Sequence, residues 1–217
     1  MPRKNEKKKY VFEYKASTND YLLALAYHSS FSRLLFPTSK NYRIVLDWLI
    51  SNEEFLKNED NSLPSIKELS QYLNLDRTKL SKYLKEIYDD IFALNETQPN
   101  LFMKEGQYLC HLTFSYLNCR AYFSIGLDVI PRIDDCLNFN FIKPQNSGSM
   151  FYVDKVYHEL DGVNHSISIS LNSDYPNKYF KLLKEKAYLH HYISFHEFLE
   201  PMNYTEVEEL VKWYREL

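Results

Sequence analysis

The sequence is poor in the residues and patterns that mark several common classes of protein. It has only four glycines in 217 residues, and it contains neither G-x-G-x-x-G nor G-x-x-x-x-G-K-[S/T], which argues against a glycine-rich phosphate-binding loop. No apolar run approaches the roughly 20 residues that span a bilayer. The basic start MPRKNEKKKY is not followed by the apolar stretch of a secretory signal. We therefore expect a cytoplasmic protein with no membrane partner.

Cysteine and net charge are scarce as well. The three cysteines, Cys110, Cys119 and Cys136, are odd in number and lie in apolar or strand-like segments, which favours reduced thiols over a disulfide framework. The net charge is −3, so any contact with nucleic acid has to come from a local basic patch. What the chain has in quantity is apolar residues (45%) and aromatic residues (16%), which is typical of a folded globular protein.

The most informative stretch is PSIKELSQYLNLDRTKLSKYLKEIYDDI, residues 64–91. Ser65 and Glu68 form an S-x-x-E capping box, which predicts the start of a helix. Asn74 stands where the end of that helix requires a residue that tolerates the left-handed conformation, and Asp76 is a good N-cap for a second helix. Two amphipathic helices joined by so short a turn predict a helix-turn-helix.

The first turns of the second helix carry basic and hydroxyl side chains, and no acid stands between Asp76 and Glu86. Such side chains contact phosphates and base edges when the N-terminal part of a helix lies in the major groove of duplex DNA. The predicted contacts from this helix are Arg77, Thr78, Lys79, Ser81, Lys82 and Lys85. The alternative is a three-helix protein-interaction module that touches no nucleic acid.

Residues 66–87 resemble the helix-turn-helix of winged-helix transcription regulators. The residues that carry the resemblance are Ile66, Glu68, Leu69, Leu73, Leu75, Arg77, Ser81 and Leu84. Asn74 replaces the usual glycine of that pattern, and Asp76 replaces the usual Ser or Thr cap. The resemblance is close over residues 64–91, extends more loosely over 42–125, and implies a β-hairpin wing. We expect that wing in LFMKEGQYLCHLTF, with Lys104 at its tip as a further DNA contact.

The second half of the chain mixes strand-like and helical segments. Asp161-Gly162 is a favoured two-residue hairpin turn, which would pair His158 with His165 and place Ile167 on a core-facing side together with Ile169 and Leu171. The two paired histidines are a metal half-site at most, because no third ligand is identifiable. The last helix has an apolar stripe that packs on the sheet or forms a symmetric interface: Val207, Leu210, Val211 and Tyr214.

These patterns predict an α+β protein in which an N-terminal winged helix-turn-helix is followed by a small antiparallel sheet or partial barrel with C-terminal helices. The expected divisions are a basic arm over residues 1–15, a winged-helix-like domain over 16–126 and an α+β domain over 127–217. The expected function is sequence-specific binding of double-stranded DNA, in transcription regulation or in replication initiation. The alternative is a non-enzymatic adaptor with the same fold. No catalytic constellation is visible, so we expect no enzyme, cofactor or metal; a homodimer is left open.

Overall fold

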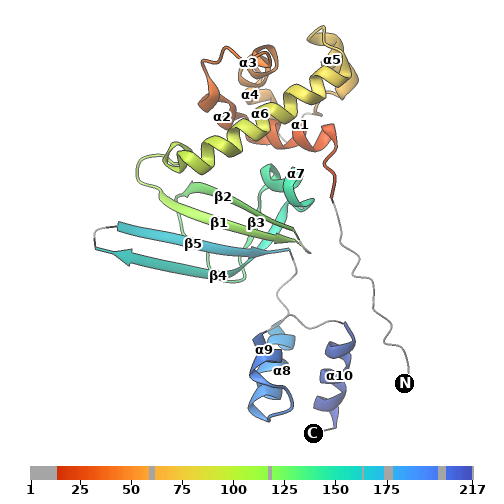
Figure 1. The fold of residues 1–217 in the computed structure, drawn as a ribbon, viewed down its shortest axis with the longest axis vertical. Helices are drawn as coiled ribbons and strands as arrows, with labels where there is room; N and C mark the ends of the chain where they lie inside the picture. Colours follow the sequence, from red (N-terminus) through yellow and green to blue (C-terminus); the bar gives the residue numbers. More distant parts are fainter. Residues whose placement is uncertain are drawn as a thin grey trace, which may run out of the picture. The chain divides into compact units, whose positions relative to one another are not determined.

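In the computed structural model, helices precede and follow one curled sheet of five strands, so the chain has an α+β fold (Figure 1). The structure describes residues 14–58, 62–116, 119–162, 164–173, 178–199 and 204–216. The α+β class and the C-terminal helices agree with the prediction. The first 13 residues, which make up most of the predicted basic arm, lie outside the described part.

Helices make up the N-terminal part of the described chain: α1 (Thr18–Tyr27), α2 (Ser29–Ser32), the 3₁₀ turn η1 (Arg33–Leu35), α3 (Arg43–Ser51), α4 (Glu53–Lys57), α5 (Ile66–Tyr72) and α6 (Arg77–Thr97). A capping box between Ser17 and Asp20 starts α1. The sequence from Thr18 to Phe36 predicts one helix, but the helix breaks at His28. The break lies next to serines at positions 29, 30 and 32, whose helix propensity is lower than that of the Leu and Ala residues of α1.

The sheet follows the 3₁₀ turn η2 (Pro99–Phe102), and its strands are β1 (Tyr108–Tyr116), β2 (Cys119–Leu127), β3 (Cys136–Asn138), β4 (Met150–Asp161) and β5 (Asn164–Asn172). Between β3 and β4 lie η3 (Asn140–Ile142) and α7 (Lys143–Asn146). The spatial order is β2-β1-β5-β4-β3. All neighbours are antiparallel except β1 and β5, which are parallel. The sheet is therefore mixed and curls into a half-barrel (Figure 1), which agrees with the predicted partial barrel and corrects the antiparallel strand pairing of the prediction.

The β4–β5 hairpin forms as expected, but its register differs from the prediction by two residues. Asp161 pairs with Asn164, Leu160 with His165 and His158 with Ile167. A two-residue turn at Asp161-Gly162 would also pair Leu160 with Val163, which lies outside the described residues. The inner-face pairs Val153–Leu171 and Val156–Ile169, separated by an irregularity near Asp154, fix the register. Packing of the core along the strands thus outweighs the preference of the turn.

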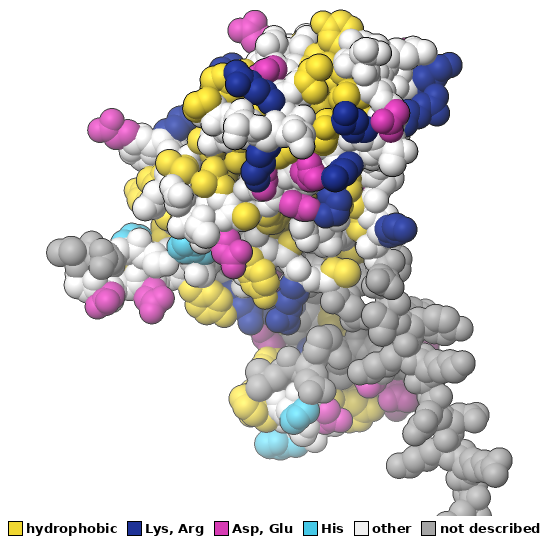
Figure 2. Space-filling view, turned by 45° about the horizontal axis from the view of Figure 1, so that its top comes forward, with side chains coloured by type: hydrophobic (Ala, Val, Ile, Leu, Met, Phe, Trp, Pro, Cys, Tyr) yellow, Lys and Arg dark blue, Asp and Glu magenta, His cyan; other side chains and the backbone are white. Residues whose placement is uncertain are grey.

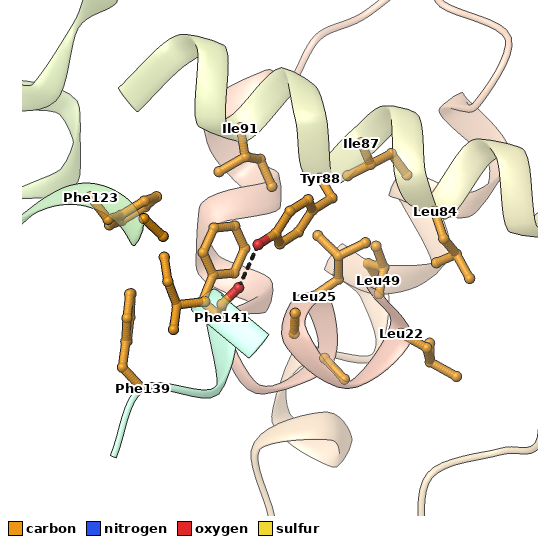
Figure 3. Close-up of a cluster of buried hydrophobic side chains, with 14 of the residues drawn as sticks. Leu22, Leu25, Leu49, Leu84, Ile87, Tyr88, Ile91, Phe123, Phe139 and Phe141 are labelled. Atoms are coloured by element: carbon orange, nitrogen blue, oxygen red, sulfur yellow. Dashed lines mark hydrogen bonds between the residues drawn. The ribbon is translucent and has the colours of Figure 1, made fainter. Parts of the chain in front are cut away.

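One apolar core joins the N-terminal helices to the inner face of the sheet. Ile167, Ile169 and Leu171 are each 1% exposed, as predicted. The side chain of Tyr88 on α6 reaches across the core, and its hydroxyl donates to the carbonyl oxygen of Phe141 at 2.9 Å (Figure 3). The ring of Phe141 stacks on the ring of Phe92, also on α6, with 5.4 Å between centroids.

The core and the sheet both cross the predicted boundary between residues 126 and 127, because β1 and β2 share one sheet with β3, β4 and β5. The chain instead divides into two compact units at Asp174 and Tyr175. The second unit contains α8 (Lys178–Leu189), α9 (Phe195–Leu199) and α10 (Tyr204–Arg215). Within it, Leu210 of the predicted C-terminal stripe is buried in a cluster with Leu183, Ala187 and Ile193. The C-terminal stripe therefore packs against α8, a partner that the sequence does not predict.

Candidate nucleic-acid interface

The turn between α5 and α6 has the structure that the sequence predicts. The side chain of Ser65 accepts a hydrogen bond from the backbone N–H of Glu68, and the carboxylate of Glu68 accepts from the backbone N–H of Ser65. Asn74 has a φ of 51°, in the left-handed region. The backbone N–H of Leu75 donates to the carbonyl oxygen of Ser70 at 2.9 Å, and that of Asn74 donates to the carbonyl of Gln71 at 3.2 Å. This pair of bonds is a Schellman motif, which ends α5 and redirects the chain.

The second helix starts directly after this turn. Asp76 accepts a hydrogen bond from the backbone N–H of Lys79 at 2.8 Å and so caps α6. Seven residues of α6 are buried: Leu80, Tyr83, Leu84, Ile87, Tyr88, Ile91 and Asn95. They form one stripe at helical spacing. The opposite face of the first turns is left to solvent.

Five of the predicted contact residues lie together on this solvent-facing side of α6: Arg77, Thr78, Lys79, Lys82 and Lys85 are all exposed. Ser81 differs from them, because it is only half-buried and its hydroxyl lies 2.7 Å from the hydroxyl of Thr18 on α1. That hydrogen bond points Ser81 toward the protein. The structure thus gives Ser81 a role in attaching α1 to α6.

Acidic residues one turn further along α6 face some of these cations. Glu86 lies 3.7 Å from the ammonium group of Lys82, and Asp89 accepts a hydrogen bond from Lys85. The hydrogen bond that Lys85 donates to Asp89 raises the pKa of Lys85. On the face shown in Figure 2, Lys and Arg side chains lie among acidic and apolar ones. Arg77 and Lys79, in the first two turns of α6, therefore lie before the acidic residues Glu86 and Asp89 of this helix.

Lys104 does not lie with the other predicted contacts. It follows the far end of α6, a helix of 21 residues that at 1.5 Å per residue is roughly 30 Å long, whereas the other predicted contacts lie in the first half of that helix. The turn at Lys104–Gly106 exists, with a φ of 84° at Gly106. It connects η2 to β1, however, and the hairpin β1–β2 comes one strand later. A wing with Lys104 at its tip is therefore not formed; Pro99 favours a 3₁₀ turn where the first wing strand was expected.

A buried carboxylate fixes the entry of the chain into α1. Asp20 accepts hydrogen bonds from the Tyr14 hydroxyl at 2.7 Å and from the Ser17 backbone N–H at 2.9 Å, and its other oxygen lies 3.3 Å from the ammonium group of Lys143. Burial opposes ionisation of this carboxyl, but the hydrogen bonds from Ser17 and Tyr14, and the contact with Lys143, prevail and lower its pKa to about 2. Asp20 is thus an ionised tether between α1 and α7.

A groove of about 680 Å³, which the sequence did not predict, lies where the C-terminal half of α6 passes the edge strand β2. Asn95 forms part of it, with its side-chain amide donating to the Ser124 carbonyl at 2.7 Å and accepting from the Ser124 backbone N–H at 2.8 Å. Across the strands, the His111 ring nitrogen Nδ1 lies 2.8 Å from the Ser124 hydroxyl. The alternation of polar residues in 108–116 and 119–127 is the one sequence signal that indicates this face.

Two further features bear on function. An apolar cleft of about 440 Å³ lies beside the helix-turn-helix, and its lining includes Trp48, Phe55 and Tyr72, of which the last two are 46% and 76% exposed. At the β4–β5 hairpin, Nδ1 of His158 lies 2.9 Å from Nε2 of His165. The described residues contain no group of three or more His, Cys, Asp or Glu that could hold a metal ion.

Comparison of the chain with models of protein families, with curated proteins and with solved structures found no match. Among the helices of the described residues, none combines the length and the apolar character needed to cross a bilayer.

Proposed function

We propose that this protein binds double-stranded DNA in a sequence-specific manner through α5 and α6, with the first turns of α6 in the major groove. The observation that carries the proposal is the Schellman turn at Asn74, which places the exposed Arg77, Thr78 and Lys79 at the start of a capped helix. A recognition helix meets base edges with such N-terminal residues. Lys82 and Lys85 extend the same surface toward phosphates.

The role that we assign to this binding is transcription regulation. Replication initiation is the alternative role and would use the same DNA contacts. A single recognition helix reads only a few base pairs, and regulators therefore usually bind as two-fold dimers over paired half-sites. A homodimer is accordingly part of the proposal. The winged-helix resemblance supports the proposal only over the helix-turn-helix, because the hairpin β1–β2 belongs to a five-stranded sheet.

A protein-interaction adaptor is the second candidate, and the apolar cleft beside α5 favours it. Phe55 and Tyr72 are exposed large apolar residues that border this cleft, and exposed apolar patches commonly mark sites where proteins associate. The two functions differ in one measurable property. DNA binding weakens steeply with salt, since neutralised phosphates release counterions, whereas an apolar contact does not.

The decisive experiment compares two triple variants that remove the same charge. Replacing Arg77, Lys79 and Lys82 with Ala should abolish retention of mixed-sequence duplex DNA, or reduce the log–log slope of binding against salt by up to about 2.7, at roughly 0.9 for each phosphate that the variant no longer neutralises. The control replaces Lys181, Lys212 and Arg215, exposed cations of the C-terminal helices. The control should bind like the wild type.

Two results would count against DNA binding. One is a wild-type protein that does not retain duplex DNA even at low salt, and the other is an equal loss in both triple variants. The first result would favour the second candidate function, a protein-interaction adaptor. In that case, Phe55→Ala and Tyr72→Ala are the variants to test in partner binding.

A further inference from the structure

The outer face of the sheet, opposite the core, has a composition distinct from the rest of the surface. Because side chains alternate along strands, the residues between the buried ones point to this face. Across β2, β1, β5 and β4 they form three rows: Tyr122–Thr113–Ser170–Lys155, Ser124–His111–Ser168–Tyr157 and Arg120–Ser115–Asn172–Tyr152. We call these three rows the outer sheet face.

The two central strands of the outer sheet face carry mostly small hydroxyl residues. Larger side chains flank them, with Tyr122 on β2 63% exposed and Tyr157 on β4 54% exposed. Arg120 and Lys155 are exposed cations on the same two strands. The structure describes all twelve residues of the rows, and none of them is Asp or Glu. The nearest acids on β4 are Asp154, in the irregularity beside Lys155, and Glu159, two residues beyond Tyr157, and both are exposed. Within the three rows, aromatic rings and cations without an acid are complementary to nucleobases and phosphates.

The groove beside β2 adds depth to this face. Its lining includes Arg120, Tyr122, Ser124 and His111, which all belong to the outer sheet face. The opposite wall, on α6, contributes Asp89 and Glu96. An anionic backbone is therefore expected to run across the strands from Arg120 toward Lys155, away from α6, while the groove has room for a neutral base beside Tyr122.

We propose that the outer sheet face binds single-stranded DNA, with bases stacked on Tyr122 and Tyr157 and phosphates against Arg120 and Lys155. Unpaired bases expose their ring faces, whereas a duplex hides them in its stack, so an exposed tyrosine selects the single strand. The two tyrosines lie three strands apart, roughly 14 Å at about 4.8 Å per strand, and would hold separate bases. The choice of DNA over RNA rests on the proposed duplex binding.

The test measures fluorescence anisotropy of labelled oligothymidylate with the full chain at low salt. Tyr122→Ala and Tyr157→Ala should each weaken binding about fivefold or more, the effect of losing one stacked base. Tyr122→Phe and Tyr157→Phe keep the ring and should stay within about twofold of the wild type. Replacing Arg120 and Lys155 with Gln should weaken binding and reduce its dependence on salt.

Controls separate this face from the helix-turn-helix. Tyr72→Ala removes an exposed tyrosine of α5 (76% exposed) and should leave binding of oligothymidylate unchanged. The Arg77/Lys79/Lys82 variant should lose duplex binding and keep single-strand binding, and the Tyr122/Tyr157 variant should show the reverse. Failure of one proposal is thus distinguishable from failure of the other.

Three outcomes would overturn the inference. The first is a wild-type protein that does not bind oligothymidylate. The second is a loss in the Phe variants as large as in the Ala variants, which would mean that stacking is not involved. The third is tighter binding of the matched oligouridylate than of the DNA strand, which would make RNA the ligand.

Discussion

The two halves of α6 share one buried stripe but differ in what they present outward. The first half, from Arg77 to Lys85, presents cations and lies directly after the Asn74 turn. The second half presents Asp89 and Glu96 and uses Asn95 to satisfy the backbone of β2 at Ser124. An edge strand has unpaired backbone groups that need such cover. A single helix therefore offers a binding surface at one end and completes the sheet at the other.

We expect the largest loss of stability from removing Asn95, the polar contact between the second half of α6 and β2. Asn95→Leu leaves the backbone N–H and carbonyl of Ser124 without their partners, which should lower the free energy of unfolding by about 3 kcal/mol. Urea denaturation measures this loss. Glu96→Ala, at an exposed neighbouring position, should cost less than about 0.5 kcal/mol. If the two variants were equally stable, Asn95 would not be the residue that secures the edge of the sheet.

We expect the next largest loss of stability from removing Asp20, the ionised tether between α1 and α7. The folded-state pKa of Asp20, about 2, lies below its ordinary value of 3.8. Ionised Asp20 therefore stabilises the fold above pH 4, and this stability is lost as pH falls through about 2. We expect Asp20→Asn to cost on the order of 2 kcal/mol at neutral pH.

Urea denaturation as a function of pH checks the role of Asp20. The difference in free energy of unfolding between the wild type and Asp20→Asn should narrow as pH approaches 2. Tyr14→Phe removes one of several hydrogen bonds to the carboxylate, so its free energy of unfolding should differ less from that of the wild type. A gap that does not change with pH would show that Asp20 acts through packing and not through its charge.

A smaller loss of stability is expected from substitutions at Asn74, in the turn that precedes the first half of α6. Asn74→Val should cost on the order of 1 kcal/mol, because a β-branched side chain is strained at a φ of 51°. Asn74→Gly should be neutral or slightly stabilising. Thermal unfolding compares the stability of the two variants. The affinity for duplex DNA should fall in Asn74→Val. Equal stability of the two would mean that the turn tolerates another conformation.

The smallest effect on stability is also the sharpest test of the charge difference between the halves. Replacing Glu86 and Asp89 with Gln and Asn removes two exposed ion pairs, which should change stability by less than about 0.5 kcal/mol each. Lys82 and Lys85 then lose their acidic neighbours, and duplex binding should tighten about threefold at low salt. Glu208→Gln with Glu209→Gln is the control of equal charge. An unchanged affinity for duplex DNA in the Glu86/Asp89 variant would show that Lys82 and Lys85 are not part of the DNA-binding surface.

Local signals in the sequence predicted local structure well. The capping box at Ser65, the left-handed Asn74 and the cap at Asp76 each depend on residues within one turn of the chain, and all three are confirmed. The composition around Arg77 likewise predicted an exposed basic helix start. Such features depend on backbone conformation and hydrogen bonds that a few neighbouring residues decide.

The features that the sequence did not reveal depend on contacts between distant segments. The parallel pairing of β1 with β5, the register of β4 with β5 and the position of Lys104 all follow from which apolar side chains meet in the core. Ser81 matched the regulator pattern, yet its hydroxyl contacts Thr18, 63 positions away. Asn95 gave no signal at all, because an asparagine within a helix is recognisable as an edge cap only once β2 lies beside it.

The parallel pair β1–β5 has a consequence for how the chain can be divided and how it folds. Each hairpin, β1–β2 and β4–β5, closes locally, whereas Cys110 meets Ile167 only after the intervening segment has been synthesised and collapsed. Contacts of such long sequence separation slow folding, since the loop must close before the contact stabilises it. Until then β1 has a bare edge that other chains can join. A fragment that ends at residue 126 would keep that edge permanently and should aggregate, so the helix-turn-helix depends on β5 for a soluble form.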